Sequence, residues 1–404
     1  MCDPTVRTDC GTRFIEVFRM KKLTRILSYI LVAALASAIT MSAMTQPPEE
    51  EHYSKLEELT ALIEYYFIED TDRAAMEDAA AMAMVDSLGD RWSYYLTADE
   101  YLAYVEQMQN AYVGIAITIT VAEDGSGFEV IKVNEGGPAE EAGMLAGDVI
   151  ITIEGQPVEG MTTTEGRDLV RGEEGTQVHM QVRRGDEILD MTITRKTVQT
   201  PVAEAKLLDG GMGLVTIYNF DGRCAQETIA AIESLLEQNA KALIFDVRNN
   251  PGGYKKELVE ILDYLLPEGP LFRSENYAGQ VTVDESDAKC LEIPMAVLIN
   301  GESYSAAEFF AAALDEYDAA IIVGEPTTGK GYFQSTFELE DGSAVGLSIG
   351  KYTTPHGVSL ADVGITPEVY VEVDQETAAK IYAGTMDPAL DPQILAAIEA
   401  LLAQ

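Results

Sequence analysis

The chain has 404 residues, of which 47% are hydrophobic and 24% are charged, and this composition excludes a fully disordered protein. The length allows two or three domains, each with its own buried core. The formal net charge of −41 is strongly acidic, which argues against nucleic acid and anionic lipid headgroups as partners.

The N-terminal part has the charge pattern of an export segment. Lys21, Lys22 and Arg25 precede residues 26–48, which carry no charge, and three glutamates follow. A positive flank before an apolar stretch keeps that flank in the cytoplasm. We therefore expect a signal anchor or a signal peptide over residues 26–46, and its length favours the uncleaved anchor.

This segment sets the expected location of the protein. An uncleaved anchor would leave residues 1–25 in the cytoplasm and hold the rest at the extracytoplasmic face of the cell membrane, whereas cleavage would give a secreted protein. Residues 1–19 fit neither part, so Met20 is an alternative start. Export also permits a disulfide between Cys224 and Cys290, although two free thiols fit the sequence equally well.

Residues 53–109 are expected to be helical and to carry no catalytic group. Leu56, Leu59 and Ile63 recur at helical spacing. Gly89 is expected to end a second helix, and Thr97 has the residue type and position of the N-cap of a third.

From Tyr112 the apolar period changes from helical spacing to two, which is typical of strands. Two short helices are expected between these strands, at residues 139–142 and 164–170. A β-rich module over residues 110–196 follows from this pattern. Its expected strands are residues 113–121, 128–133, 149–153, 178–182 and 188–193.

The module resembles a PDZ domain in two motifs, Val113-Gly114-Ile115 and the glycine-rich residues 137–150. A PDZ domain binds the C-terminus of a peptide as an added edge strand, and loop N–H groups hold the terminal carboxylate. The resemblance implies that the carboxylate-binding loop consists of Tyr112, Val113, Gly114 and Ile115.

After a linker near residues 197–205, apolar strands alternate with amphipathic helices, which predicts a mixed α/β core over residues 197–375. A helical segment over residues 376–404 follows. The expected core strands are residues 213–218, 242–247, 295–299 and 320–323, the helices are 225–238, 256–265 and 305–314, and a hairpin joins 334–339 to 344–349.

Peptide hydrolysis needs a nucleophile, a base within reach and donors for the oxyanion. The three histidines, His52, His179 and His356, have no evident partner, so a Ser-His-Asp triad is disfavoured. The sequence also has no HExxH motif and no Cys/His cluster, so no metal site is expected.

Ser305 lies at a strand–turn–helix junction, a position that exposes a serine at the start of a helix. Taken alone, Ser305 and Glu308 also match the capping box of an ordinary helix. Lys330 lies between two glycines and, taken alone, is equally typical of a solvated loop.

Three motifs in a fixed order change this interpretation. Residues 246–253, 303–308 and 323–331 follow the PDZ-like module and resemble the C-terminal processing, or tail-specific, peptidases, a Ser–Lys serine peptidase family. The likeness extends from about residue 55 to the C-terminus. It implies an α+β, mixed α/β multidomain fold with an N-terminal helical segment, a PDZ module and a ClpP- or crotonase-like peptidase core.

The same resemblance implies a role for each matching residue. Ser305 is the nucleophile, Lys330 its general base and Gln334 the group that orients the lysine. Burial must then lower the pKa of the lysine from its ordinary value of about 10.4. The implied oxyanion donors are the N–H groups of Ala306 and of Gly252 or Gly253, and Arg171 is implied to link peptide binding to the active site.

The chain departs from the family pattern at Thr328, Tyr304 and Val113. These changes affect pocket shape and PDZ selectivity and remove no catalytic group.

The expected function is that of an exported serine endopeptidase without a cofactor, which recognises accessible C-termini of protein or peptide substrates. A noncatalytic PDZ scaffold on an inactive peptidase domain is the alternative. A crotonase-like acyl-CoA enzyme would need neither the PDZ module nor export. A homo-oligomer is compatible with the sequence, which does not indicate the natural substrate.

Overall fold

The computed structural model describes residues 55–403 and divides into two units, residues 1–79 and 80–404. The export segment and His52 lie outside the described residues. In the part of the chain that the structure describes, no helix is both long and apolar enough to cross a membrane. The first unit contains α2 (Lys55–Tyr66) and the start of α3 (Arg73–Asp86), and Arg73 lies 3.6 Å from Glu64.

The second unit begins with a segment that is not wholly helical, contrary to the prediction for residues 53–109. The short strand β1 (Tyr94–Leu96) pairs antiparallel with β18 (Ala344–Thr353), with Tyr94 opposite Gly346. The helix α4 (Ala98–Met108) then starts at Thr97 with a capping box, which confirms the predicted helix start.

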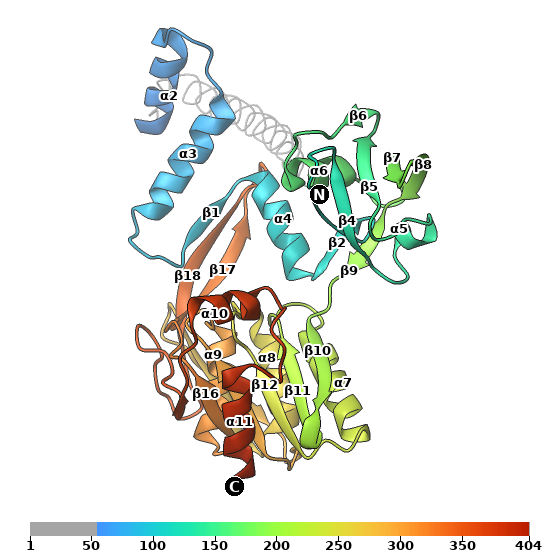
Figure 1. Cartoon of the computed structure of the whole chain (residues 1–404). Coiled ribbons are helices and arrows are strands. Elements are labelled where there is room, and N and C mark those ends of the chain that lie inside the picture. The colour runs from blue at the N-terminus through green and yellow to red at the C-terminus, as the bar shows by residue number, and fades with distance from the viewer. Residues whose placement is uncertain (1–54, 404) are drawn as a thin grey trace, which may run out of the picture. The chain divides into compact units, whose positions relative to one another are not determined.

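A six-stranded antiparallel sheet forms the PDZ module (Figure 1). Its order is β3-β4-β5-β7-β8, with β6 paired to β5, so β3 is an edge strand. The strands are β3 (Ile117–Val121), β4 (Phe128–Val133), β5 (Val149–Ile153), β6 (Gln156–Pro157), β7 (Gln177–Arg184) and β8 (Glu187–Thr194), and the helices are α5 (Pro138–Glu141) and α6 (Thr163–Val170).

The PDZ module is closed by a separate two-stranded sheet. The strand β2 (Ala111–Gly114) pairs antiparallel with β9 (Lys196–Gln199). The predicted linker at residues 197–205 is therefore wrong, because these residues belong to β9 and to the start of β10 (Ala203–Leu208). Because β9 ends at Gln199 and β10 begins at Ala203, only residues 200–202 connect the PDZ module to the peptidase core without belonging to a strand.

The peptidase core is built on a second six-stranded sheet in the order β10-β11-β12-β15-β16-β19 (Figure 1). The pair β10–β11 is antiparallel and all the other pairs are parallel. The further strands are β11 (Met212–Ile217), β12 (Ala242–Asp246), β15 (Met295–Ile299), β16 (Ala320–Gly324) and β19 (Val369–Tyr370).

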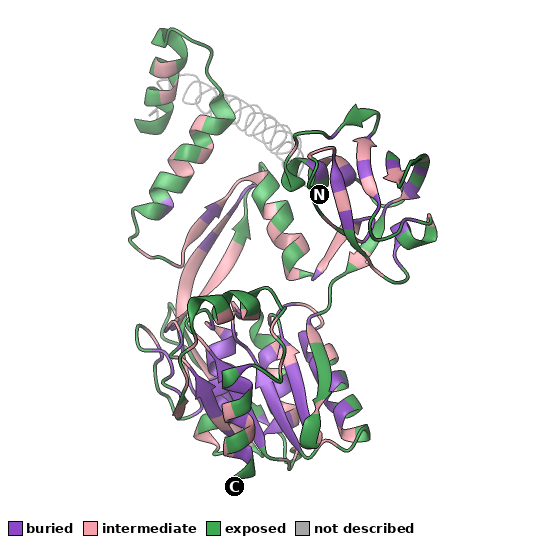
Figure 2. Cartoon of the chain, viewed as in Figure 1, coloured by how far each residue is buried: buried purple, intermediate pink, exposed green. Residues whose placement is uncertain are grey.

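Helices cover both faces of this sheet, as expected for a largely parallel sheet. Val215, Phe245 and Val297 pack against the helices α7 (Cys224–Glu237), α8 (Lys255–Leu265) and α9 (Ala306–Glu316). Their neighbours Leu214 and Ile244 pack on the opposite face against α11 (Pro392–Leu402), which follows α10 (Gln375–Tyr382). The two middle strands, β12 and β15, are consequently buried at every position (Figure 2).

An antiparallel sheet that the sequence only partly predicted completes the core. The order is β1-β18-β13-β14, and β17 (Tyr332–Glu338) pairs with the other side of β18. The hairpin of β13 (Gly269–Asn276) and β14 (Val281–Ser286) was not predicted.

Candidate active site

Ser305 lies where β15 ends and α9 begins. Its backbone has φ 59° and ψ −124°, a conformation that a residue with a side chain adopts only under constraint from its surroundings. Because β12 and β15 are parallel neighbours, the segments that follow them emerge at the same edge of the sheet. Residues 247–253 therefore lie beside the turn that leads to Ser305.

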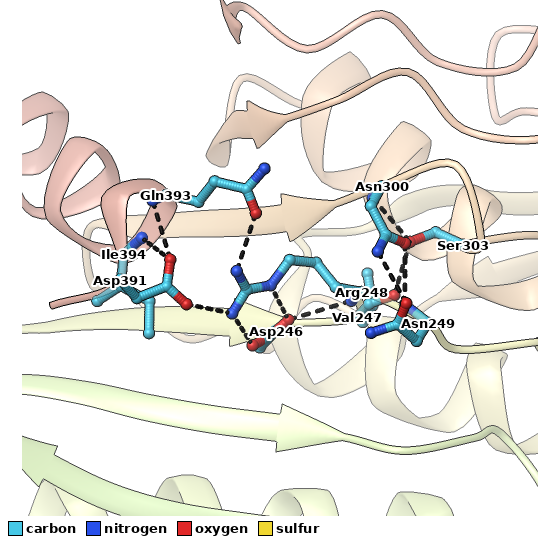
Figure 3. A network of polar contacts seen from close by, with 9 residues as sticks. All are labelled: Asp246, Val247, Arg248, Asn249, Asn300, Ser303, Asp391, Gln393 and Ile394. Atoms are coloured by element: carbon cyan, nitrogen blue, oxygen red, sulfur yellow. Dashed lines mark hydrogen bonds and ion pairs between the residues drawn. The ribbon is translucent and has the colours of Figure 1, made fainter. Parts of the chain in front are cut away.

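Side-chain hydrogen bonds hold these two segments together (Figure 3). The Asn249 backbone N–H donates to Asn300 Oδ1 at 2.9 Å, and Asn300 Nδ2 donates back to Asn249 Oδ1 at 2.9 Å. Ser303 Oγ donates to the Val247 carbonyl at 2.7 Å. The turn before Ser305 is thus attached directly to the end of β12.

A buried ionic network anchors the same segment to the C-terminal part of the chain (Figure 3). The Arg248 guanidinium lies 2.6 Å from Asp246 Oδ2 and 2.9 Å from Asp391 Oδ2. Arg248 Nη1 also donates to Gln393 Oε1 at 2.8 Å. The start of α11 therefore supports the loop that contains Gly252 and Gly253.

That loop lies against the expected nucleophile. Gly252 has φ +90°, and a Cβ at this position would lie 2.7 Å from Ser305 Cβ and 2.8 Å from the Ala306 nitrogen. The Gly252 N–H already donates to Asn250 Oδ1 at 2.8 Å. Among the described residues, the N–H groups of Gly253 and Ala306 have no acceptor, so Gly253 is the better placed of the two glycines to bind an oxyanion.

One buried carboxylate connects the segments of Ser305 and Lys330. Glu308 accepts the Ser305 N–H at 3.0 Å and the Lys330 N–H at 2.9 Å through Oε2. Its Oε1 accepts from Thr327 Oγ1 at 2.6 Å and from the Gly329 N–H at 2.7 Å. Burial raises the pKa of the Glu308 carboxyl, and these hydrogen bonds oppose the rise.

Lys330 has the environment that a lysine base requires. Burial lowers the pKa of its amine to about 8, while the charges of Glu308 and Asp90 oppose the shift. Its Nζ lies 4.8 Å from the centre of the Trp92 ring and 5.9 Å from that of Tyr304. With this pKa about a tenth of the amine is neutral at pH 7 and about half at pH 8.

Ser305 Oγ and Lys330 Nζ are not hydrogen bonded to each other in this structure. Ser305 Oγ lies 3.0 Å from the hydroxyl of Tyr352 instead. Burial raises the pKa of the Tyr352 hydroxyl well above its ordinary value, so this group keeps its proton. The two residues are connected here only through their backbone N–H groups, which share Glu308 Oε2.

Gln334 does not lie beside the Lys330 amine, which it was predicted to orient. It is on the strand β17, beside a register shift between Phe333 and Gln334, and not one helical turn after Lys330. Its Nε2 donates to Ser348 Oγ at 2.9 Å and more weakly to the Tyr332 carbonyl. Gln334 makes no hydrogen bond with the amine, so the structure does not show the predicted orienting contact.

In the PDZ module, Tyr112, Val113 and Gly114 lie on β2, and the Ile115 carbonyl accepts the Ala139 N–H at 3.0 Å. Arg171 ends α6 and lies 3.1 Å from Glu106 on α4. Arg171 makes no contact with Ser305 or Lys330, so the structure does not show its predicted link to the active site.

Comparisons with known proteins assign the chain and its PDZ module to families. The profile of peptidase family S41 matches residues 211–371, and a PDZ profile matches residues 129–184. The carboxy-terminal processing protease CtpA of Bacillus subtilis is 31% identical over 88% of this chain and 78% of its own length. The chain belongs to peptidase family S41.

Two further comparisons give a second similar relative and a solved structure with the same fold. It is 33% identical to the chloroplastic carboxyl-terminal-processing peptidase 2 of Arabidopsis thaliana over 72% of this chain, and it spans 59% of that relative's length. A solved S41 protease from Bacteroides fragilis shares the fold with a TM-score of 0.50 and 17% identity, over 83% of this chain and 99% of the other. The predicted family, fold class and serine peptidase activity are thereby confirmed.

Sequence reasoning missed several residues that lie near the candidate residues Ser305 and Lys330. Trp92 lies in the segment for which no chemistry was predicted, and Glu308 was interpreted only as half of a capping box. Tyr352 was not singled out. The long sequence separation between these residues and Ser305 or Lys330 left no local signal for Trp92 or Tyr352.

The histidines and cysteines of the described chain take no part in this site. His179 Nδ1 lies 3.0 Å from Thr192 Oγ1 on the PDZ sheet, and the exposed His356 lies 3.7 Å from Glu316. Cys224 is buried, Cys290 is exposed, and both are free thiols. The disulfide that the sequence left open is absent.

Asp221 is a buried carboxyl beside the glycine loop. Its Oδ1 has no hydrogen-bond partner in the described part of the chain, and a Cβ on Gly253 would lie 2.6 Å from it. Burial raises the pKa of Asp221 to about 7, and the charge of Glu257 adds to the rise. The unfolded chain would ionise this group near pH 4. The folded state therefore loses stability as the pH rises from about 4 to about 7.

We expect Asp221→Asn to raise the free energy of unfolding at about pH 8 by as much as about 4 kcal/mol, and by much less near pH 5. Denaturation by urea at both pH values measures this difference. Asp209→Asn removes an exposed carboxylate and is the matched control. An equal effect of Asp221→Asn at the two pH values would contradict the prediction.

Proposed function

We propose that this S41 peptidase cleaves peptide bonds with Ser305 as nucleophile and Lys330 as general base. The observation that supports this proposal most is the position of Glu308, whose Oε2 accepts the backbone N–H groups of both residues. This arrangement attaches the backbones of the two residues to one carboxylate and does not use either side chain.

In the proposed reaction, neutral Lys330 takes the proton of Ser305 Oγ as the oxygen attacks the scissile carbonyl. The N–H groups of Ala306 and Gly253 stabilise the negative oxygen of the tetrahedral intermediate. Lys330 then gives its proton to the leaving amine, and water hydrolyses the acyl group on Ser305. Gln334 would support the base from β17 through the neighbouring β18.

We further propose that substrates are recognised by their C-termini. The edge strand β3 follows directly after residues 112–115, and no other strand of the described chain pairs with its outer side, where a peptide could add. The names of the relatives state carboxy-terminal processing, which accords with this role. The proposed limits are residues 110–196 for the PDZ domain and 197–375 for the peptidase core.

Export and assembly belong to the same proposal. Residues 26–46 would hold the enzyme at the extracytoplasmic face of the membrane, or release it if they are cleaved. Protein substrates with accessible C-termini are the proposed partners, and self-association is compatible with this arrangement.

Two matched substrates test recognition of the C-terminus. We expect the purified enzyme to cleave a disordered protein ending in small apolar residues with a kcat/KM at least about tenfold higher than the same protein ending in two aspartates. Equal values would contradict C-terminal recognition without bearing on the catalytic residues.

The same substrate pair tests the role of Arg171. If its ion pair with Glu106 transmits peptide binding, Arg171→Ala should lower cleavage of the apolar-ended substrate most. An Arg171→Ala enzyme that cleaves both substrates at wild-type rates would show that Arg171 has no such role.

A further inference from the structure

Two aromatic rings lie near the Lys330 amine, which has no anionic partner in direct contact among residues 55–403. Its Nζ lies 4.8 Å from the Trp92 ring centre and 5.9 Å from that of Tyr304. The two rings are themselves 5.9 Å apart and tilted by 36°. Within the described residues, the amine makes no ion pair and no hydrogen bond.

Trp92 is fixed in this position by a chain of hydrogen bonds. Its backbone N–H donates to Asp90 Oδ1 at 3.1 Å, and Ser93 Oγ donates to Asp90 Oδ2 at 2.6 Å. The Ser348 N–H on β18 donates to Ser93 Oγ at 3.1 Å, and Gln334 Nε2 donates to Ser348 Oγ. Gln334 therefore supports the turn that carries Trp92.

The charged groups near the amine come from two elements. Glu308 on α9 and Asp90 before β1 favour the protonated amine, and Arg91 beside Trp92 disfavours it. Tyr304 is neutral in the working pH range because burial raises its pKa. An aromatic face attracts a cation and not a neutral amine, which changes a protonation equilibrium by about 2- to 30-fold.

We propose that Trp92 is a positioning residue that, with Tyr304, holds the Lys330 ammonium in an aromatic pocket apart from Ser305 Oγ. Loss of a proton weakens this attraction and frees the amine to turn toward the serine. The release of the amine toward Ser305, which is the second step, rests on the proposed function. The first step, the contact between Trp92 and the ammonium, exists whether or not the chain cleaves a substrate.

The fluorescence of Trp92 tests the contact directly, because this is the only tryptophan of the chain. The emission of the full-length protein is expected to change with pH, with a midpoint near pH 8. The Lys330→Met protein keeps the length of the side chain without its charge and should lack this transition. An identical transition in both proteins would overturn the proposal. The measurement needs no substrate, so it is independent of the proposed function.

Kinetics distinguish positioning from a merely structural role. Trp92→Leu is expected to raise the ratio of kcat/KM at about pH 6.5 to that at about pH 9.5 by about 2- to 30-fold, because less of the amine is held protonated. Trp92→Phe keeps an aromatic face and should restore most of the wild-type ratio. A Trp92→Leu enzyme with the wild-type ratio would overturn the proposal, whatever its absolute rate.

Discussion

Ser305→Ala and Lys330→Ala are each expected to lower kcat/KM for a disordered protein substrate by at least about 10³-fold. Each removes one member of a pair that acts as a unit, so the double variant should be no slower than either single variant. Cleavage assays on the purified full-length chain measure all three. Lys351→Ala, which removes an exposed lysine on β18, is the matched control and should retain wild-type activity.

The pH dependence of the wild-type enzyme follows from the same assignment. Only the neutral amine can accept a proton, and the pKa of Lys330 is lowered to about 8. The value of kcat/KM should therefore rise about tenfold for each pH unit below about 8 and level off above it. Cleavage that survives in both single variants, or a rate that falls as the pH rises toward 8, would contradict the Ser–Lys dyad.

Arg248→Met is expected to have the largest effect on stability, a decrease of about 3–5 kcal/mol in the free energy of unfolding. The guanidinium is only 4% exposed and lies between the carboxylates of Asp246 and Asp391. Methionine fills much of the same space, but two buried carboxylates would lose their partner. Chemical denaturation of the purified variant measures the change.

Two comparisons isolate the charge effect at Arg248. Arg167 is 54% exposed and pairs with Asp168 on the surface, so Arg167→Met should cost less than about 0.5 kcal/mol. Adding Asp391→Asn to Arg248→Met should recover part of the loss, because it removes one of the unpaired charges. Equal costs for the two arginine variants would mean that the network in Figure 3 does not stabilise the fold.

Local patterns predicted most of the fold. The apolar runs of β11, β12, β15 and β16 have the length and composition of buried strands, and the glycine motif of residues 137–150 indicated the PDZ module. The short strand β1 carries no such signal. It exists because Tyr94 pairs with Gly346, about 250 residues away, and no window of the sequence contains both.

The part of the candidate site that belongs to sequence motifs was predictable. The segments that carry Ser305, Lys330 and the glycine loop lie beside one another, since the parallel neighbours β12, β15 and β16 end at one edge of the sheet. Gln334 follows Lys330 by four positions, a spacing that equals one turn only in a helix. Residues 332–338 form a strand instead, so the spacing did not place Gln334 beside the amine. Trp92 was not predicted because its contact with Lys330 depends on the pairing of β1 with β18.

The way in which Glu308 binds has a consequence for how such a site could change. Its carboxylate holds main-chain N–H groups at Ser305, Gly329 and Lys330, and not their side chains. The backbone frame that Glu308 holds, at Ser305, Gly329 and Lys330, is therefore independent of which side chains react at these positions. A different nucleophile or base could occupy the same two positions without rebuilding the loops, whereas a change at Glu308 would disturb every pair of groups that the frame could carry.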